Sequence, residues 1–311
     1  MSNPLYILCP GQGAQHVGMG KDFAEKFPVA RKLFDEAGRI LGFDLAEVCF
    51  NGPEERLNQT DVSQPAIYVT SVAAFAAARE AGRIHPEAVT AYAGLSLGEY
   101  TALHLGGAFG FEEGLKLVAA RGRYMQEAAV ATPSGMVSVL GADEAAVLSL
   151  CEAAAGGEVL VPANYNSPGQ IVVSGALAAC ERLAKAAEAS GFRAIPLKVA
   201  GAFHSPIMRP GAERMSAELA RASIVAPRTP VYSNVSADVH GPPDSIRERL
   251  VDQIIKPVKW EPTMQKLLAA SPEARWIELA PGRVLTGLLK KINRRIPVES
   301  YATADALIEA Q

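Results

Sequence analysis

The segment GLSLG, residues 94–98, could present a reactive hydroxyl at a sharp turn. The small apolar run AYA comes before it, and the helix-forming run EYTALHL follows it. Gly-x-Ser-x-Gly between a strand and a helix is the nucleophile elbow, in which the glycines permit the turn and the hydroxyl of Ser96 projects from the strand end. The backbone N–H of Leu97 would lie at the helix N-terminus and could donate to an oxyanion. A serine that only caps the following helix is the simpler alternative.

A nucleophilic serine needs a general base, and His204 in VAGAFHSPIM is the best candidate. Small residues and a proline flank it, so we expect it in a loop, from which it can reach a cleft more easily than from inside a helix. A loop histidine that is merely hydrogen-bonded is the alternative. The remaining histidines, His16, His85, His104 and His240, are expected to pack, cap or face solvent.

Alternating strand and helix patterns predict how Ser96 is held. Residues 4–9 and 88–94 are short apolar runs typical of buried strands. Helical patterns lie between and after them, including residues 21–41 with a break near Pro28 and residues 111–129 with an apolar stripe. Such alternation favours a parallel α/β sheet.

The pattern changes between about residues 135 and 199. There the order is strand, helix, strand, strand, helix, strand, which is the ferredoxin-like order. We therefore predict an α/β fold: a large α/β-hydrolase-like domain with a parallel sheet, residues 1–130 and 200–311, plus an inserted small ferredoxin-like domain, residues 131–199. A cleft between two domains is the default place for a ligand.

Composition excludes several classes of function. The 311 residues are 49% hydrophobic and 20% charged, and a net charge of −3 gives no reason to expect nucleic acid as a partner. No stretch approaches the roughly 20 apolar residues of a membrane span, and the apolar run before Pro10 is too short for a signal peptide. The four cysteines form no CxxC pair, so we expect free buried thiols, no metal site and a cytoplasmic protein.

Two glycine-rich alternatives fail on spacing. The segment GQGAQHVG lacks the third glycine of a dinucleotide fingerprint, since His16 stands at that position. No GxxxxGK[ST] phosphate loop occurs.

Several long motifs in order resemble the malonyl-CoA:acyl carrier protein transacylase family along nearly the whole chain. These motifs are PGQGAQHVGMG, LNQTDVSQPA, GLSLGEYTAL, RGRYMQEA, NYNSPGQIVVSG, GAFHSPIM, QIIKPVKW and ELAPGRVLTGLLKKI. The resemblance implies that Ser96 is the nucleophile and that His204 is its base and then its acid. It also implies that the backbone carbonyl of Gln253 orients the imidazole, and that the backbone N–H groups of Gln12 and Leu97 form the oxyanion hole.

The resemblance further assigns a substrate-binding set: Arg121, Met125, Phe203 and Gln64. Arg121 would bind the malonyl carboxylate, and Met125 and Phe203 would shape the acyl pocket. The choice of arginine also has a physical reason, because a planar guanidinium binds a carboxylate bidentately and keeps its charge in a dry pocket. An arginine on a helix surface is the alternative.

The implied reaction is a ping-pong transfer from coenzyme A to the phosphopantetheine thiol of acyl carrier protein, by a monomer and without a metal or redox cofactor. Acyl carrier proteins are generally acidic, so a basic docking surface is expected. Its candidates are Lys198, Arg283, Lys290, Lys291, Arg294 and Arg295.

The chain departs from the family pattern at three positions. Leu95 stands where many members have histidine, Lys256 where a small polar residue is more usual, and Ala280 where glycine is commoner. Three alternatives stay open: a serine hydrolase of acyl thioesters, an inactive scaffold subunit, and a trans-acting malonyl loader of a polyketide or malonate decarboxylase system.

Overall fold

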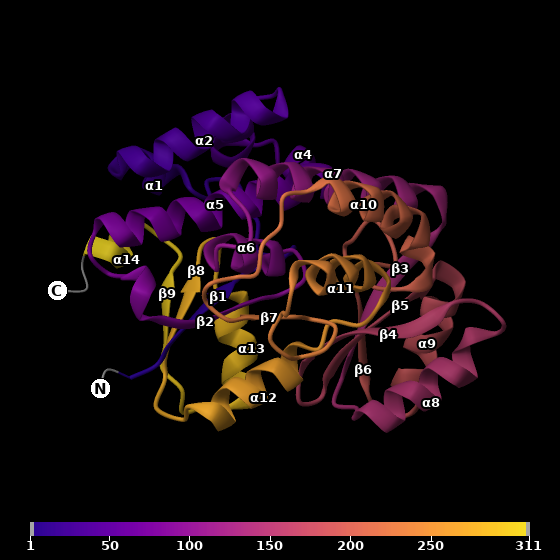
Figure 1. Cartoon of the computed structure of the whole chain (residues 1–311). Helices are drawn as coiled ribbons and strands as arrows, with labels where there is room; N and C mark the ends of the chain where they lie inside the picture. Colours follow the sequence, from indigo (N-terminus) through magenta and orange to yellow (C-terminus); the bar gives the residue numbers. More distant parts are fainter. Residues whose placement is uncertain (1–2, 309–311) are drawn as a thin grey trace.

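The computed structural model describes residues 3–308, in which the chain forms two β-sheets (Figure 1). Sheet A has five strands in the order β7-β2-β1-β8-β9, and every neighbouring pair is parallel. Its strands are β1 (Leu5–Cys9), β2 (Val89–Gly94), β7 (Val231–Tyr232), β8 (Arg275–Leu279) and β9 (Val298–Tyr301). The predicted parallel α/β sheet is therefore confirmed.

Helices cover both faces of sheet A because side chains alternate along its buried strands. On β1, Ile7 and Cys9 belong to one apolar core, whereas Tyr6 and Leu8 belong to another. The first core is closed by α1 (Lys21–Lys26), α2 (Pro28–Leu41), α5 (Thr60–Glu80), α6 (Gly98–Leu105), α7 (Phe111–Ala131), α10 (Arg209–Arg221) and α11 (Pro243–Ile255). The second is closed by α12 (Trp260–Ala270) and α13 (Val284–Ile292).

Local sequence explains where several helices begin and end. The break predicted near Pro28 is confirmed: α1 ends at Lys26 and Pro28 occupies the first turn of α2, where a missing N–H costs nothing. The short elements are α3 (Leu45–Asn51), α4 (Glu54–Leu57), α14 (Asp305–Ile308) and the 3₁₀ turns η1 (Pro86–Ala88) and η2 (Pro206–Met208).

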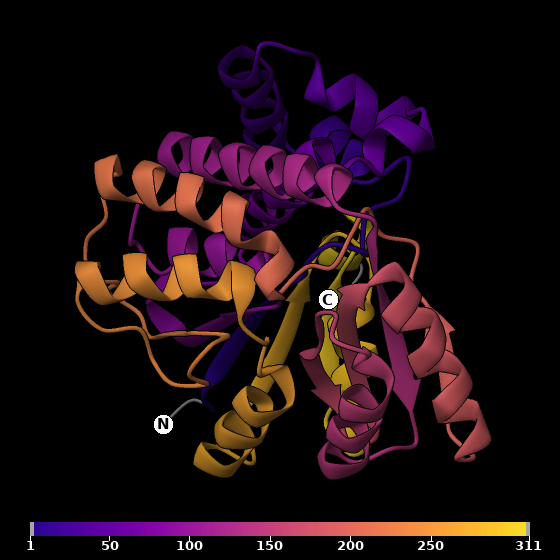
Figure 2. The same ribbon diagram turned by 90° about the vertical axis from the view of Figure 1, so that its right-hand side faces the viewer.

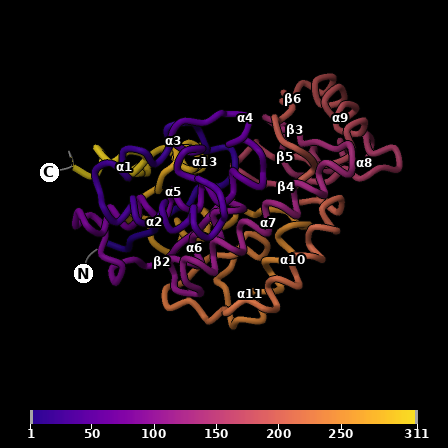
Figure 3. The backbone as a smooth tube through the Cα atoms, turned by 90° about the horizontal axis from the view of Figure 1, so that it is seen from above, coloured from indigo at the N-terminus to yellow at the C-terminus, as the bar shows by residue number. Residues whose placement is uncertain are grey.

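Sheet B is antiparallel and forms a separate unit at one end of the molecule (Figures 2 and 3). Its order is β4-β5-β3-β6, with two helices between the strands in sequence, which confirms the ferredoxin-like expectation. The elements are β3 (Ser134–Leu140), α8 (Glu144–Ala155), β4 (Leu160–Ser167), β5 (Gln170–Ala176), α9 (Leu177–Ala189) and β6 (Arg193–Pro196). Val139, Val147 and Leu183 are part of its own buried core.

Backbone hydrogen bonds connect the small domain to the large domain at Val258. The Tyr165 N–H donates to the Val258 carbonyl at 2.9 Å, and the Val258 N–H donates to the Ala163 carbonyl at 2.8 Å. Strand β4 is thereby tied to the segment just before α12, which fixes one wall of the space between the domains.

Strand β6 is shorter than the sequence suggested. The expected strand ran through Val199, but β6 ends at Pro196. Leu197 still donates its N–H to the Met136 carbonyl at 2.9 Å, and the Val199 N–H then turns back to the Leu197 carbonyl at 3.0 Å. The chain then leaves the sheet, and residues 197–199 line the cavity described below.

The cysteines behave as expected, since Cys9, Cys49, Cys151 and Cys180 are all free and buried. Burial raises the pKa of the Cys151 thiol to about 12, so it stays protonated near neutral pH. Across residues 3–308, none of the helices is long and apolar enough to cross a bilayer.

Candidate active site

The turn between β2 and α6 has the geometry of a nucleophile elbow. Ser96 lies there with φ of 52°, in the left-handed region that non-glycine residues rarely adopt. A Cβ on Gly94 would lie 1.9 Å from the carbonyl carbon of Gly98, and a Cβ on Gly98 would lie 2.1 Å from the Cys9 oxygen. Only glycine fits at either position. Leu97 is the N-cap residue of α6 and no side chain caps the helix, so Ser96 is not a capping serine.

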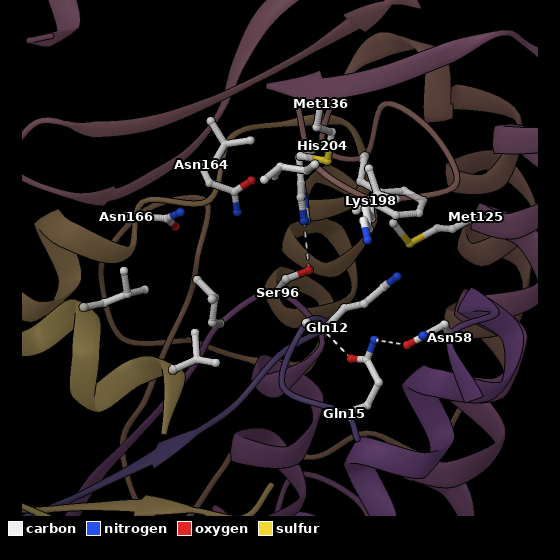
Figure 4. A pocket seen from close by; sticks show the side chains of 18 of the residues that line it. Gln12, Gln15, Asn58, Ser96, Met125, Met136, Asn164, Asn166, Lys198 and His204 are labelled. Carbon is white, nitrogen blue, oxygen red and sulfur yellow. Dashed lines mark hydrogen bonds between the residues drawn. The ribbon is translucent and has the colours of Figure 1, made fainter. Parts of the chain in front are cut away.

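Ser96 and His204 meet although 108 positions separate them in sequence. The Oγ of Ser96 lies 2.8 Å from Nε2 of His204 (Figure 4). Nδ1 of the same ring lies 2.6 Å from the backbone oxygen of Gln253 on α11. Because a carbonyl only accepts, the proton lies on Nδ1 and leaves Nε2 free to accept from the serine hydroxyl. This is the tautomer that a general base requires.

The environment keeps this imidazole neutral. Burial, followed by the positive charge of Arg121, lowers the pKa of His204 to about 3, while the hydrogen bond to Gln253 acts in the opposite direction. His204 is therefore unprotonated near neutral pH and able to take a proton from Ser96.

Arg121 on α7 is a buried cation whose hydrogen bonds all go to neutral groups. Its side chain is among the largest that are fully buried, so it is not a surface arginine. Nη1 donates to Gln64 Oε1 at 2.7 Å, and Nη2 donates to Ser96 Oγ at 3.1 Å and Gln253 Oε1 at 2.9 Å. A guanidinium buried with neutral partners beside a nucleophile is suited to receive an anionic group of a substrate.

Two backbone amides near Ser96 have no protein acceptor. Within residues 3–308, the N–H groups of Gln12 and Leu97 make no backbone or side-chain hydrogen bond. The loop that carries Gln12 packs directly on the elbow, since a Cβ on Gly11 would lie 2.2 Å from the Leu95 oxygen. These amides are available to a developing oxyanion.

A cavity of about 580 Å³ opens between the two domains and contains Ser96 and His204 (Figure 4). Met125 and Phe203 lie in its wall, together with Met136 from the small domain. Leu95 and Lys198 line it too. Lys256 does not, and it instead forms an exposed ion pair with Asp252 at 2.8 Å.

Sequence reasoning did not single out three asparagines that the structure brings to the site. Asn164 and Asn166 on β4 line the cavity, and the buried Oδ1 of Asn166 has no hydrogen-bond partner. Asn234 holds the elbow: its Oδ1 accepts from the Ser96 N–H and its Nδ2 donates to the Gly94 carbonyl, both at 2.7 Å. The sequence around these asparagines, NYN and SNVS, contains no motif that would identify them as site residues. Each of their contacts is with a distant part of the chain.

Together, an elbow serine, a neutral histidine, two open amides and a buried cation are the groups that an acyltransferase with a serine nucleophile would need for an anionic acyl group. Comparisons with known proteins agree. The family model described as "Acyl transferase domain" matches residues 6–309. The malonyl CoA-acyl carrier protein transacylase of Escherichia coli (strain K12) is 40% identical over 287 residues, covering 92% of each chain. That of Bacillus subtilis (strain 168) is 42% identical over 294 residues, covering 94% of this chain and 91% of the relative.

Solved structures give the same result. The transacylase of Coxiella burnetii superposes with a TM-score of 0.95 at 36% identity, covering 100% of this chain and 97% of the other. A malonyl-transacylase solved in complex with its type II PKS acyl-carrier protein has a TM-score of 0.94 at 36% identity, with 99% of both chains covered. The chain therefore belongs to the malonyl-CoA:acyl carrier protein transacylase family of acyltransferases.

The elbow geometry predicts that Gly98→Ala is strongly destabilising. The new Cβ would meet the backbone oxygens of Cys9 and Pro10, which cannot move without distorting β1. Overpacking of this kind costs about 1–3 kcal/mol or more, so the denaturation midpoint and acylation of Ser96 should both fall. Gly287→Ala on α13 is the matched control, because nothing lies within 4 Å of its Cβ position. Equal midpoints for the two variants would contradict the steric argument.

The environment of His204 predicts a flat pH profile. With acyl-pantetheine substrates, which lack phosphate groups, the rate of Ser96 acylation should hold between pH 8 and pH 5, since the imidazole becomes protonated only as the pH nears its pKa of about 3. Arg121→Ala removes one cause of the lowered pKa, so the acidic limb for an acetyl substrate should move to higher pH. Single-turnover kinetics measure both profiles. A limb near pH 6.5 in the parent enzyme would show that the histidine titrates as if it were in water.

Proposed function

We propose that this chain transfers a malonyl group from coenzyme A to the phosphopantetheine thiol of an acyl carrier protein through a malonyl ester of Ser96. The observation that best supports this function is the position of the Arg121 guanidinium. It is buried 3.1 Å from Ser96 Oγ, and its hydrogen-bond partners are all neutral. The names of the curated relatives support the same substrates.

In the first half-reaction, Ser96 Oγ attacks the thioester carbonyl while Nε2 of His204 takes the hydroxyl proton. The N–H groups of Gln12 and Leu97 stabilise the tetrahedral oxyanion. The carbon–sulfur bond then breaks, and the imidazolium returns its proton to the departing thiol. In the second half-reaction the carrier protein's thiol gives its proton to His204 and attacks the ester carbonyl. The bond from the carbonyl carbon to Ser96 Oγ then breaks, and the imidazolium returns the proton to that oxygen.

Arg121 provides the preference for malonyl. Its two terminal nitrogens can bind a carboxylate bidentately, with Gln64 holding one of them in place at 2.7 Å. Met125 and Phe203 are 1% and 5% exposed. They form an apolar wall for the carbon chain between the ester and the carboxylate. Malonyl-CoA and the carrier protein present the same pantetheine arm. Its amides would form hydrogen bonds with Asn164 and Asn166, which line the cavity.

The phosphate that ends this arm would lie near the cavity mouth. Lys198 lines the cavity, and Lys291 reaches its rim by donating to Gln170 at 2.6 Å. Arg295 does not fit the docking surface, since it lines a separate hollow with Asn3 and Leu5 at the amino ends of the strands. The proposal includes action as a monomer in the cytoplasm, without a metal or redox cofactor.

The nucleophile is tested by Ser96→Ala. This variant should fold, because the contacts with Asn234 that hold the elbow use the backbone N–H of Ser96 and the carbonyl of Gly94, and it should lose all covalent labelling. Intact-mass spectrometry after mixing with malonyl-CoA measures the adduct. Addition of carrier protein to the labelled parent should move the adduct to the carrier, whereas release to water would identify a hydrolase. A malonyl adduct on the alanine variant would disprove the role of Ser96.

The carboxylate site is tested by Arg121→Ala. Breaking a buried charge pair costs about 3–5 kcal/mol, so malonyl transfer should fall by on the order of 100- to 1,000-fold or more. Acetyl transfer has no carboxylate to lose and should hold or improve. Arg123→Ala, on the same helix but exposed, is the matched control and should leave the ratio of the two rates unchanged. Equal loss of malonyl and acetyl transfer in Arg121→Ala would make this residue structural.

A further inference from the structure

Beneath the Ser96–His204 pair lies a buried carboxylate that no step of the transfer uses. The side chains of Glu99 and His240 are both fully buried, and Glu99 Oε1 lies 2.6 Å from His240 Nε2. The other oxygen, Oε2, accepts from Gln253 Nε2 at 2.6 Å and from the Asn234 backbone N–H at 3.1 Å. Burial of a carboxylate is costly unless both oxygens are satisfied, as they are here.

The side chain of Gln253 links this carboxylate to the substrate site. Its Oε1 accepts from Arg121 Nη2 at 2.9 Å, while its Nε2 donates to Glu99 Oε2. A guanidinium has only donors and a carboxylate has only acceptors, so the amide fits between them in one orientation. The reversed amide would set its NH₂ group against the guanidinium and its carbonyl against the carboxylate. Glu99 Oε2 and the Ser96 backbone carbonyl, which accepts from the same Nε2 at 2.9 Å, therefore together determine which atom of Gln253 faces Arg121.

His240 completes the arrangement from the opposite side. A carboxylate can only accept, so the imidazole donates through Nε2, and within residues 3–308 its Nδ1 has no hydrogen-bond partner. His240 thereby satisfies Oε1 of Glu99 and leaves Oε2 to Gln253 and Asn234.

We propose that Glu99 is a positioning residue for the substrate carboxylate, acting on Arg121 through the side-chain amide of Gln253. The inference rests on the proposed function, since only a carboxylate-bearing acyl group needs Arg121 in a defined place. Loss of the acceptor at position 99 removes the shortest contact of the amide nitrogen, at 2.6 Å, and leaves those to the Ser96 carbonyl at 2.9 Å and Asn234 Oδ1 at 3.3 Å. The amide oxygen then holds the guanidinium beside Ser96 less firmly. Malonyl transfer depends on this contact, whereas acetyl transfer does not.

Two variants separate the acceptor from the charge. Glu99→Met removes the acceptor at similar length, and the ratio of malonyl to acetyl kcat/KM should fall at least tenfold, chiefly through a higher KM for malonyl-CoA. Glu99→Gln keeps an acceptor for Gln253 and Asn234 while its NH₂ group donates to His240 with the ring proton moved to Nδ1. Its ratio should stay within about threefold of the parent.

Glu278→Met is the matched control for loss of a buried carboxylate. Glu278 is fully buried and accepts from the backbone N–H groups of Leu285 and Thr286 at 2.8 and 2.7 Å, so its loss should lower the denaturation midpoint without changing the ratio. Should Glu99→Met fail to fold, Gln253→Met tests the same link, because it keeps the carbonyl that supports His204 and removes only the amide.

The outcomes are distinct. A parent enzyme that transfers no malonyl group overturns the proposed function itself. A parent that does so, with an unchanged malonyl-to-acetyl ratio in Glu99→Met or Gln253→Met, overturns this inference alone. A Glu99→Gln variant that loses as much selectivity as Glu99→Met would also overturn it, since the acceptor would then not be what matters.

Discussion

The site depends on the buried guanidinium of Arg121, which lies beside the nucleophile and is linked to the carboxylate of Glu99 only through the amide of Gln253. Its partners, Gln64, Ser96 and Gln253, come from three separate parts of the chain and are all neutral. A buried cation without a paired anion is costly, and the substrate carboxylate would offset that cost. The same charge acts on His204, whose pKa it helps to lower, so recognition of the acyl group and the state of the base share one origin.

The surrounding fold fixes the position of the Arg121 guanidinium relative to Ser96. Sheet A brings the ends of β1 and β2 together, so that the loop carrying Gln12 packs on the elbow at Leu95. Asn234 follows β7, the next strand along, and clamps both the N–H of Ser96 and the carbonyl of Gly94. The small domain, joined through Val258, supplies the opposite wall of the cavity. Ser96 thus lies at the end of a strand, and His204 lies in the loop before η2, where the carbonyl of Gln253 holds its ring. The second domain contributes to the cavity wall.

The sequence predicted the features that local pattern controls. The elbow follows from two glycines with a strand before and a helix after, and the ferredoxin-like unit follows from the order of its apolar runs. Spacing alone could not pair Ser96 with His204, which lie 108 positions apart, or assign the carbonyl of Gln253, which lies 49 positions from His204; there the family resemblance supplied the expectation. Asn234 and Glu99 were not predicted for the same reason. The role of a buried polar residue can be inferred only when its partners, which are distant in sequence, are known. The predicted strand extended beyond the end of β6 because a run of apolar residues does not show where hydrogen bonding to the neighbouring strand stops.

Gln253 connects substrate recognition with catalysis in this site. Its backbone oxygen holds the imidazole of His204, and its side-chain oxygen holds Arg121. In the free enzyme the hydroxyl of Ser96 donates to His204 and also accepts from Arg121, an interaction that draws electron density from the attacking oxygen. A carboxylate that binds the guanidinium competes for that donor and relieves the oxygen of it. The anionic substrate would thereby both fill the charge site and increase the nucleophilicity of the serine, which an acetyl group cannot do.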